Sequence, residues 1–340
     1  MKKLNKLKTS PILEEKKLDS VVDFKSNLKR NIKKWWVYQQ ERFPVIKNGL
    51  LIAVFSSSAV CYSVLLRGGK INFYPLFAAF FVAFTCVFLF FLQLRIADEF
   101  KDFADDSLYR AYRPVPRGLI SLPELGWLGV MSAIAQLGLS FWLAPSLILP
   151  LGAVWLYLGL MSKEFFIAQW LKAHPLIYML SHMVILPLIN LYSTACDWLV
   201  AGTIIPVNSF WFLLASFFNG MVIEIGRKIR VPSDEEFGVD TYSAVWGYQK
   251  AVKAWLLVLL LTAVTAVCAA NQLLFLLPVA ALLLVMFACA VGVAWLFIKK
   301  PTTRKANAIE TMSGLWTLLV YLSLGILPML LHSPKLQDLR

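Results

Sequence analysis

The sequence predicts an all-α, polytopic membrane protein: nine transmembrane helices around a central cavity, capped by cytoplasmic loops. Three observations favour this fold class. The 340 residues are 59% hydrophobic with a mean hydropathy of +0.67, which is far from the values of a soluble domain. Nine apolar segments are each long enough to cross a bilayer. Half of the twenty acidic residues gather in two short stretches between these segments.

The first 44 residues form a polar, basic arm. Thirteen of the 33 Lys and Arg residues lie before residue 48, an excess typical of a cytoplasmic segment that contacts anionic lipid. We read the net charge of +13 in this way, so nucleic acid is not an expected partner. The sequence KKWW at 33–36 predicts that the arm ends in an interfacial helix, with Trp35 and Trp36 at headgroup depth.

Hydropathy places the transmembrane segments along the rest of the chain. We expect them at about 46–66, 72–94, 124–143, 146–162, 175–195, 208–226, 252–270, 273–298 and 311–331. Ala144 and Pro145 predict a tight turn between the third and fourth segments. The chain would then comprise the arm (1–44), a nine-helix transmembrane domain (45–332) and a short tail (333–340).

Positive charge predicts the orientation of these segments. If the arm is cytoplasmic, the connections after the second, fourth, sixth and eighth segments are cytoplasmic too, and they hold most of the remaining Lys and Arg residues. The opposite side holds only Arg67, Lys70, Lys335 and Arg340. We therefore expect the amino terminus in the cytoplasm and the carboxyl terminus on the other side.

A first acidic stretch follows the second segment, at residues 95–122. Its acids are Asp98, Glu99, Asp102, Asp105 and Asp106. On a helix, Glu99, Asp102 and Asp106 lie at i, i+3 and i+7 and share one face. Carboxylates stacked in this way repel each other unless a cation lies against them, and oxygen ligands suit Mg²⁺ shared with a phosphate. The alternative is a solvated acidic helix, since runs of charge are usually exposed.

A second acidic stretch follows the sixth segment, at residues 224–240. It contains Glu224, Asp234, Glu235, Glu236 and Asp240. The predicted topology puts both stretches on the same face of the membrane. Polar clusters concentrated in this way usually mark a functional site, and two that arise four segments apart predict a shared site across a central cavity.

The first stretch resembles the UbiA superfamily of intramembrane prenyltransferases. The family's first motif, N(D/E)xxDxxxD, is followed by a segment of the type RPLPSG. Glu99, Asp102 and Asp106 match the spaced acids, Asp98 stands where the family has Asn, and residues 113–118 read RPVPRG. Spacing, tail and membrane position coincide, and the resemblance extends over nearly the whole chain after residue 44.

The second stretch resembles the family's second motif only in part. That motif is DxxxD followed by Gly and then Thr or Ser, and residues 238–243 read GVDTYS. Counting back puts Asp234 at the second acid and Arg230 at the first, and Glu224 supplies a first acid only with an insertion. Either the chain belongs to a divergent subgroup, or it holds the diphosphate in a different way.

The resemblance implies an enzyme. In the family's reaction, an allylic polyprenyl diphosphate is held by Mg²⁺ between the two acidic motifs, its C–O bond ionises, and the carbocation alkylates an electron-rich acceptor. We expect a small, aromatic acceptor of the quinone-precursor type. Diphosphate leaves as an anion, so cations must lie where its negative charge develops. The apolar donor chain would lie along the bundle with access from membrane lipid.

The same resemblance implies roles for individual residues. Catalysis would involve Glu99, Asp102, Asp106 and Lys163, the last in the segment YLGLMSK (157–163), which is similar to the end of the family's fourth helix. The implied metal ligands are Asp98, Glu99, Asp102, Asp106, Glu224 and Asp234. The implied diphosphate-binding residues are Arg113, Arg117, Arg227, Arg230 and Asn219.

Two other functions stay open on the sequence. One is a prenyl-lipid binding protein without turnover, because the second motif is degraded. The other is a transporter that uses the acids as cation ligands, although its charged residues are expected deep within the spans and not at their ends. His182, inside the fifth segment, either faces the acceptor or is a hydrogen-bonded histidine of the bundle. The sequence does not indicate an oligomeric state.

Overall fold

The computed structural model describes residues 29–68 and 73–332. Within these ranges the regular structure is entirely helical, as the sequence predicts. Nine helical segments of the described chain are long and apolar enough to cross a membrane. The predicted tail at 333–340 and the first 28 residues of the arm lie outside the described residues.

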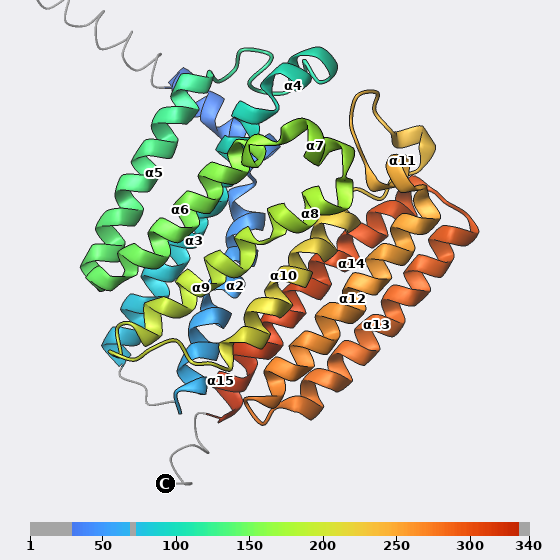
Figure 1. Ribbon diagram of the computed structural model, residues 1–340. Helices are drawn as coiled ribbons and strands as arrows, with labels where there is room; N and C mark the ends of the chain where they lie inside the picture. The colour runs from blue at the N-terminus through green and yellow to red at the C-terminus, as the bar shows by residue number, and fades with distance from the viewer. Residues whose placement is uncertain (1–28, 69–72, 333–340) are drawn as a thin grey trace, which may run out of the picture.

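The long helices run side by side in one bundle (Figure 1). They are α2 (Val45–Leu66), α3 (Phe73–Lys101), α5 (Leu122–Leu143), α6 (Ile148–Ser162), α8 and α9 (Pro175–Met183, Ile185–Trp198), α10 (Ser209–Gly226), α12 (Tyr248–Asn271), α13 (Leu276–Lys299), and α14 and α15 (Thr303–Tyr321, Leu327–His332). Helix α3 continues to Lys101 rather than ending near 94, and α14 begins at Thr303 rather than near 311. Hydropathy marks the apolar span, whereas the helix continues into charged residues at the membrane surface.

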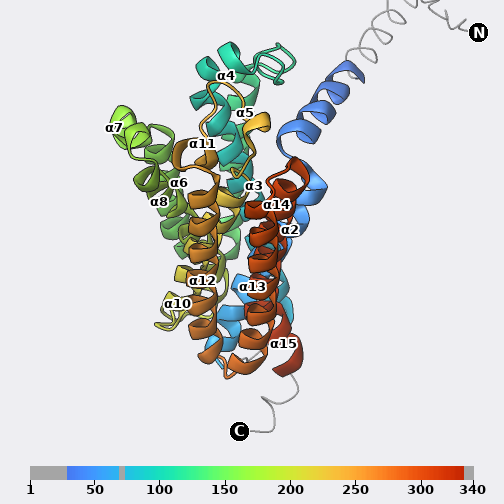
Figure 2. The same ribbon diagram turned by 90° about the vertical axis from the view of Figure 1, so that its right-hand side faces the viewer.

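Three short helices, α4 (Phe103–Tyr109), α7 (Ala168–Ala173) and α11 (Tyr242–Trp246), lie at one end of this bundle (Figure 1). The amino-terminal helix, residues 29–42, lies at that end too, whereas α15 lies at the other (Figure 2). Both acidic stretches are therefore at the same end of the bundle, as the charge pattern predicts.

Local sequence explains where the helices begin and end. At the start of α5, the Ser121 hydroxyl accepts a hydrogen bond from the Glu124 backbone N–H, and the Glu124 carboxylate accepts one from the Ser121 backbone N–H. A 3-10 turn, Pro145–Leu147, separates α5 from α6, where a tight turn is expected. Asp102 lies between α3 and α4, so the first acidic stretch bends away from the membrane span at its central carboxylate.

Small residues allow close contacts between helices. A Cβ on Gly226 would lie 2.0 Å from Ser313 Oγ of α14, and one on Gly325 would lie 2.3 Å from the Ser58 carbonyl oxygen of α2. Gly325 belongs to a π-helical turn, Leu322–Ile326, between α14 and α15. Close backbone approach of this kind is how helices associate in lipid. The Gly226 contact fixes the end of α10 directly before Arg227.

The amino-terminal helix packs on the end of the bundle. Tyr38 is 2% exposed and belongs to a small buried cluster with Ile96, Val115, Ile120 and Leu125. Trp35 packs against this cluster, whereas Trp36 is 58% exposed. Of the two indoles predicted at headgroup depth, Trp36 projects outward and Trp35 contributes to packing.

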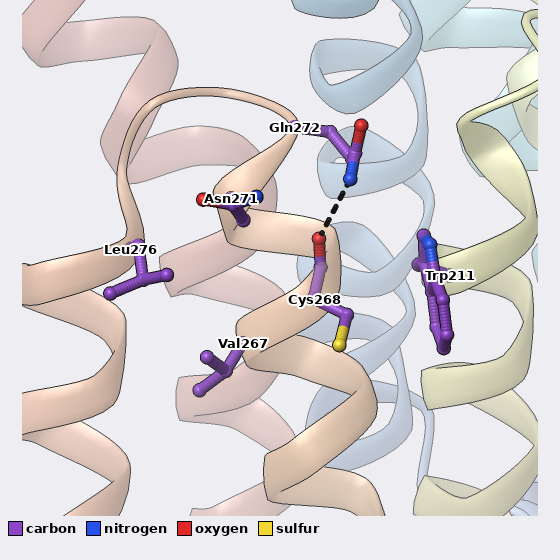
Figure 3. A pocket seen from close by; sticks show the side chains of 6 residues that line it. All are labelled: Trp211, Val267, Cys268, Asn271, Gln272 and Leu276. Atoms are coloured by element: carbon purple, nitrogen blue, oxygen red, sulfur yellow. Dashed lines mark hydrogen bonds between the residues drawn. The ribbon is translucent and has the colours of Figure 1, made fainter.

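A hollow of about 260 Å³ lies at the carboxyl end of α12, and Figure 3 shows the side chains that line it. It is lined by Trp211, Val267, Cys268, Asn271, Gln272 and Leu276. Gln272 Nε2 donates a hydrogen bond to the Cys268 carbonyl at 3.4 Å. Because it lies at the end of α12 away from α11, this hollow is not part of the region formed by the acidic stretches.

Candidate active site

The two acidic stretches contact each other at the end of the bundle. Tyr112 Oη donates a hydrogen bond to Glu236 Oε2 at 3.2 Å, and the Tyr109 and Phe237 rings meet edge to face with centroids 5.7 Å apart. Gly238 lies against Tyr109 with a φ of +75°, and a Cβ there would lie 2.6 Å from the tyrosine ring. The contact therefore requires glycine at this position. It joins segments that are 124 residues apart in the chain.

Of the predicted metal ligands in the first stretch, Asp98 and Asp102 have the fewest protein partners. Asp98 is 43% exposed and lies 3.4 Å from Arg95 Nη1. The Asp102 carboxylate has no ion pair within the described ranges. Burial raises the pKa of Asp102, and the neighbouring carboxylates of Asp98 and Asp106 raise it further, against a lowering effect of Lys101. Negative charge is thus concentrated at the end of α3, which favours a bound cation.

Glu99 and Asp106 are held by arginines. Glu99 is 2% exposed and forms an ion pair with Arg42 of the amino-terminal helix. Asp106 is 1% exposed and lies 2.8 Å from Arg110 Nη2 and 2.6 Å from Arg113 Nη1. Glu99 holds the amino-terminal helix against α3, and Asp106 holds the RPVPRG segment against α4, so Arg113 is fixed beside the site.

The remaining pair, Asp98 and Asp102, fits a Mg²⁺ ion shared with a substrate. Mg²⁺ is commonly bound by one or two carboxylates together with phosphate oxygens and water. In the described part of the chain, no group of three or more His, Cys, Asp or Glu side chains is arranged to hold a metal. The protein alone does not complete a coordination shell there, so diphosphate oxygens would have to supply the other ligands. The six predicted ligands do not form one cluster.

At the end of α10 the balance of charge is reversed. Glu224 Oε2 lies 2.8 Å from Arg227 Nε, and Glu224 Oε1 lies 2.9 Å from Lys228 Nζ. The Arg227 side chain nevertheless remains 47% exposed. Glu224 raises the pKa of Arg227, and Asp98 of the first stretch also raises it. Together with the contacts of Tyr112 with Glu236 and of Tyr109 with Phe237, this attraction indicates that the cationic end of α10 faces the same region as the anionic end of α3.

Asp234 and Arg230 lie in the loop that follows. Arg230 Nη1 lies 3.3 Å from the Asp234 carbonyl and 3.4 Å from Glu236 Oε1. The Asp234 carboxylate accepts a hydrogen bond from Ser233 Oγ at 3.2 Å. Both side chains therefore have partners within the loop itself.

Three further predicted residues have different surroundings. Arg117 forms a two-pronged ion pair with Glu41 at 3.0 and 2.8 Å. Asn219, 1% exposed, accepts a hydrogen bond from Thr317 Oγ1 at 3.2 Å, where α10 packs on α14. Lys163 is exposed at the carboxyl end of α6, with no ion pair among the described residues. Their predicted functional roles stay predictions.

The fold adds residues that the sequence prediction did not select. Arg42 and Glu41 come from the arm, where nothing in the sequence distinguishes them from residues that contact lipid. Lys101 lies within the first motif at a position the motif leaves free. Its Nζ donates a hydrogen bond to Tyr178 Oη at 2.6 Å and lies 3.6 Å from Glu164 Oε1.

A groove of about 360 Å³ lies between α3, α5 and α6. Gly126, Gly129 and Gly159 leave room in its walls, and Ala97 lines it directly before Asp98. An apolar chain lying in this groove would reach the carboxylates at the end of α3.

Three solved structures are similar to this chain. A digeranylgeranylglyceryl phosphate synthase is 15% identical, with 87% of this chain and 99% of that chain covered and a TM-score of 0.55. The apo structure of a UbiA homologue from Aeropyrum pernix K1 is 14% identical, with coverages of 78% and 96% and a TM-score of 0.58. A UbiA homologue from Archaeoglobus fulgidus, solved with DMAPP and Mg²⁺, is 13% identical, with coverages of 82% and 98% and a TM-score of 0.47.

No curated protein matches the sequence. The profile of the UbiA prenyltransferase family, in contrast, matches residues 53–318, which is more than half of the 340 residues. The match includes both acidic stretches and the helices between them. The chain therefore belongs to the UbiA prenyltransferase family.

Proposed function

We propose that the chain transfers an isoprenyl group from an allylic polyprenyl diphosphate to a small aromatic acceptor of the quinone-precursor type, with Mg²⁺ as cofactor. One observation supports this most directly: the two acidic stretches contact each other, through Tyr112 with Glu236 and through Tyr109 with Phe237. The carboxylates at the end of α3 and the cations at the end of α10 thus belong to one region, and Asp98 also raises the pKa of Arg227. This arrangement suits a diphosphate bound with its metal ion. The carboxylates can bind the metal ion, and the cations can bind the phosphate oxygens.

Each end has a distinct role in this proposal. Asp98 and Asp102 would hold the ion, which when bound supplies positive charge to the departing diphosphate. Arg227 would bind two phosphate oxygens through its planar guanidinium, and Lys228 would add a point charge. Glu224 keeps both cations in place. Arg113 and Arg117 of the RPVPRG segment would complete the cationic side.

The same arrangement favours a single Mg²⁺ ion. Glu224 is already neutralised by two cations, and Arg230 stands where the family's second motif has its first acid. In this chain, basic side chains therefore occupy the second stretch, where the family's second motif has acids that hold metal. The divergent second motif is, in this proposal, a change in how the diphosphate is held and not a loss of the site.

Aromatic faces line the region around the cations. Lys101 Nζ lies 5.3 Å from the centroid of the Tyr178 ring, and Lys228 Nζ lies 5.6 Å from that of Tyr242. Burial raises the pKa of Tyr242, and Glu224 adds to the effect, so this phenol stays neutral. An allylic carbocation reacts with water, so neutral aromatic walls are the surroundings that such an intermediate requires.

We also propose that the protein is a multi-pass integral membrane protein whose site and amino terminus are cytoplasmic, with the carboxyl terminus on the opposite side. The basic arm and the basic connections support this orientation. In this scheme the arm (1–44) lies on the membrane surface, the domain at 45–332 crosses the membrane, and the tail (333–340) follows it. Labelling of single cysteines introduced at positions 36 and 274 in intact cells would test it.

The proposed reaction is tested with the purified full chain in lipid nanodiscs. Radiolabelled geranyl, farnesyl and geranylgeranyl diphosphates are supplied with Mg²⁺ and a panel of phenols and hydroxynaphthoates. We expect prenylated product that depends on Mg²⁺ and is lost with EDTA. Donor binding without any product would instead identify a prenyl-lipid binding protein, and cation flux into sealed vesicles would identify a transporter.

A further inference from the structure

A second polar cluster lies beside the proposed diphosphate site. It is formed by Lys101 at the end of α3, Glu164 after α6, and Tyr178 and His182 on α8. Lys101 is adjacent to Asp102 in the chain, so the cluster begins on the same helical turn as the carboxylates that would hold Mg²⁺. The roles proposed above for diphosphate binding do not use Glu164 or His182.

The backbone between α6 and α7 is strained next to this cluster. Glu164, Phe165 and Phe166 have φ values of 47°, 53° and 63°, a left-handed conformation that non-glycine residues rarely adopt in succession. Two contacts hold it in place. The Glu164 carboxylate is buried and lies 3.6 Å from Lys101 Nζ, and the Phe165 ring lies between Tyr157 and His182, 5.5 and 5.9 Å from their centroids. The strain positions Phe165 against the edge of His182.

His182 has a defined tautomer. Its Nδ1 lies 2.8 Å from the Tyr178 carbonyl oxygen, which can only accept, so Nδ1 carries the hydrogen and donates it. In the neutral ring the lone pair is then on Nε2. The residue is 9% exposed, and Nε2 is buried without a hydrogen-bond partner among the described residues. A buried acceptor without a donor is costly, and it indicates a place for a ligand group that donates a hydrogen bond.

The walls around this nitrogen are aromatic. His182 is stacked on Tyr178 with centroids 4.0 Å apart and an interplanar angle of 12°, and Phe165 meets it edge to face at 87°. Lys101 fixes Tyr178 by the 2.6 Å hydrogen bond to its hydroxyl. Flat, neutral rings around an unpartnered proton acceptor match an aromatic ring that bears a hydroxyl group.

We propose that His182 Nε2 binds the hydroxyl of the acceptor and removes its proton during transfer, an inference that rests on the proposed function. The allylic C–O bond breaks and diphosphate leaves with its electron pair. A π-electron pair of the acceptor ring forms the bond to C1 of the isoprenyl group, while the hydroxyl proton passes to Nε2. The resulting dienone regains aromaticity when its ring C–H proton moves to the oxygen, and the imidazolium releases its proton to solvent. Lys101 acts here as a positioning residue, through Tyr178.

His174 provides a matched control. Its Nδ1 also lies 2.8 Å from the carbonyl oxygen four residues earlier, that of Trp170, and its ring is stacked on that residue at 4.4 Å. It differs in being exposed. His174→Gln removes the same local interactions as His182→Gln without removing a buried base.

The first experiment separates donor ionisation from transfer. With geranyl diphosphate, Mg²⁺ and 4-hydroxybenzoate as probes, His182→Gln is expected to lower prenylated product by about 100- to 1,000-fold, the usual contribution of a general base. Diphosphate release should stay within about twofold, with the cation captured by water as geraniol. His174→Gln should transfer at the wild-type rate. Wild-type transfer by His182→Gln, or an equal loss of diphosphate release and transfer, would overturn the proposal.

The second experiment does not depend on turnover. With the non-hydrolysable donor geranyl thiolodiphosphate bound, His182→Phe is expected to weaken 4-hydroxybenzoate binding at least tenfold and to leave donor affinity unchanged. Equal phenol affinity in wild type and variant overturns the role of His182 alone. Absence of Mg²⁺-dependent donor binding in the wild type overturns the proposed function, and this inference with it. If His182→Phe does not fold, as judged by thermal unfolding, His182→Gln is measured in the same way.

Discussion

The ends of α3 and α10 hold two acidic stretches of similar composition that are surrounded in opposite ways. At the end of α3, Asp98 is paired only with Arg95, at 3.4 Å, and Asp102 has no ion pair among the described residues. The pKa of Asp102 is raised. At the end of α10, Glu224 is held by Arg227 and Lys228. The role of an acid in such a motif therefore depends on how closely neighbouring cations engage its carboxylate. One stretch is suited to metal and the other to phosphate.

Asp102→Asn should have the largest effect on this contrast. We expect about a 1,000-fold loss of prenyl transfer. Without the Asp102 carboxylate, the Mg²⁺ ion that would stabilise the departing diphosphate is bound less tightly. Thermal stability should not fall, since Asp102 has no ion pair in the described residues to lose. Asp105→Asn is the control, because Asp105 is 57% exposed and lies 3.8 Å from Lys172. Near-normal transfer by Asp102→Asn would remove the metal assignment at α3.

Arg227→Gln tests the opposite end. We expect the KM for the donor diphosphate to rise about 100-fold, since a charged, two-pronged contact is lost, and Arg227→Lys to show an intermediate rise. Arg230→Gln is the comparison variant and should have a much smaller effect, because Arg230 is engaged with its own loop. Steady-state kinetics over a range of donor concentrations give these values. An unchanged KM with a lower kcat would assign Arg227 to a later step.

Glu224→Gln distinguishes a metal ligand from a residue that positions cations. We expect about a tenfold loss of donor affinity with an unchanged Mg²⁺ half-saturation concentration, because Arg227 and Lys228 would lose the carboxylate that orients them. Titration of activity with Mg²⁺ at saturating donor provides the measurement. A large rise in the Mg²⁺ requirement would show instead that Glu224 is a ligand, as the family resemblance implies.

Asp234→Asn should have the smallest effect. The carboxylate accepts a hydrogen bond from Ser233 in its own loop, and an amide oxygen can accept it equally well. Transfer rate and donor KM are expected within about twofold of wild type. A loss comparable to that of Asp102→Asn would restore the symmetric, two-motif metal site.

Much of the fold was predictable because it depends on hydropathy and charge, which can be assigned to each residue from the sequence alone. Apolar length sets the spans, and basic residues between them put both acidic stretches at one end. The pairing within the site was not predictable, because Glu99 meets Arg42 from 57 residues away and no local pattern signals this. The left-handed run at 164–166 contains no glycine that would have marked it. For His182 the sequence left two alternatives, and only the surroundings of Nε2 favour one of them.

The amino-terminal helix contributes Arg42 to Glu99 and Glu41 to Arg117. A protein shortened to begin at Val45 would still contain every transmembrane helix of the described chain, yet it would leave Glu99 as a buried, uncompensated charge and release Arg117 from its tether. Purification tags and protease sites are therefore best placed upstream of residue 29. The boundary between the arm and the transmembrane domain is where the chain enters the membrane. The part of the protein that the proposed site needs begins before this boundary, at the amino-terminal helix.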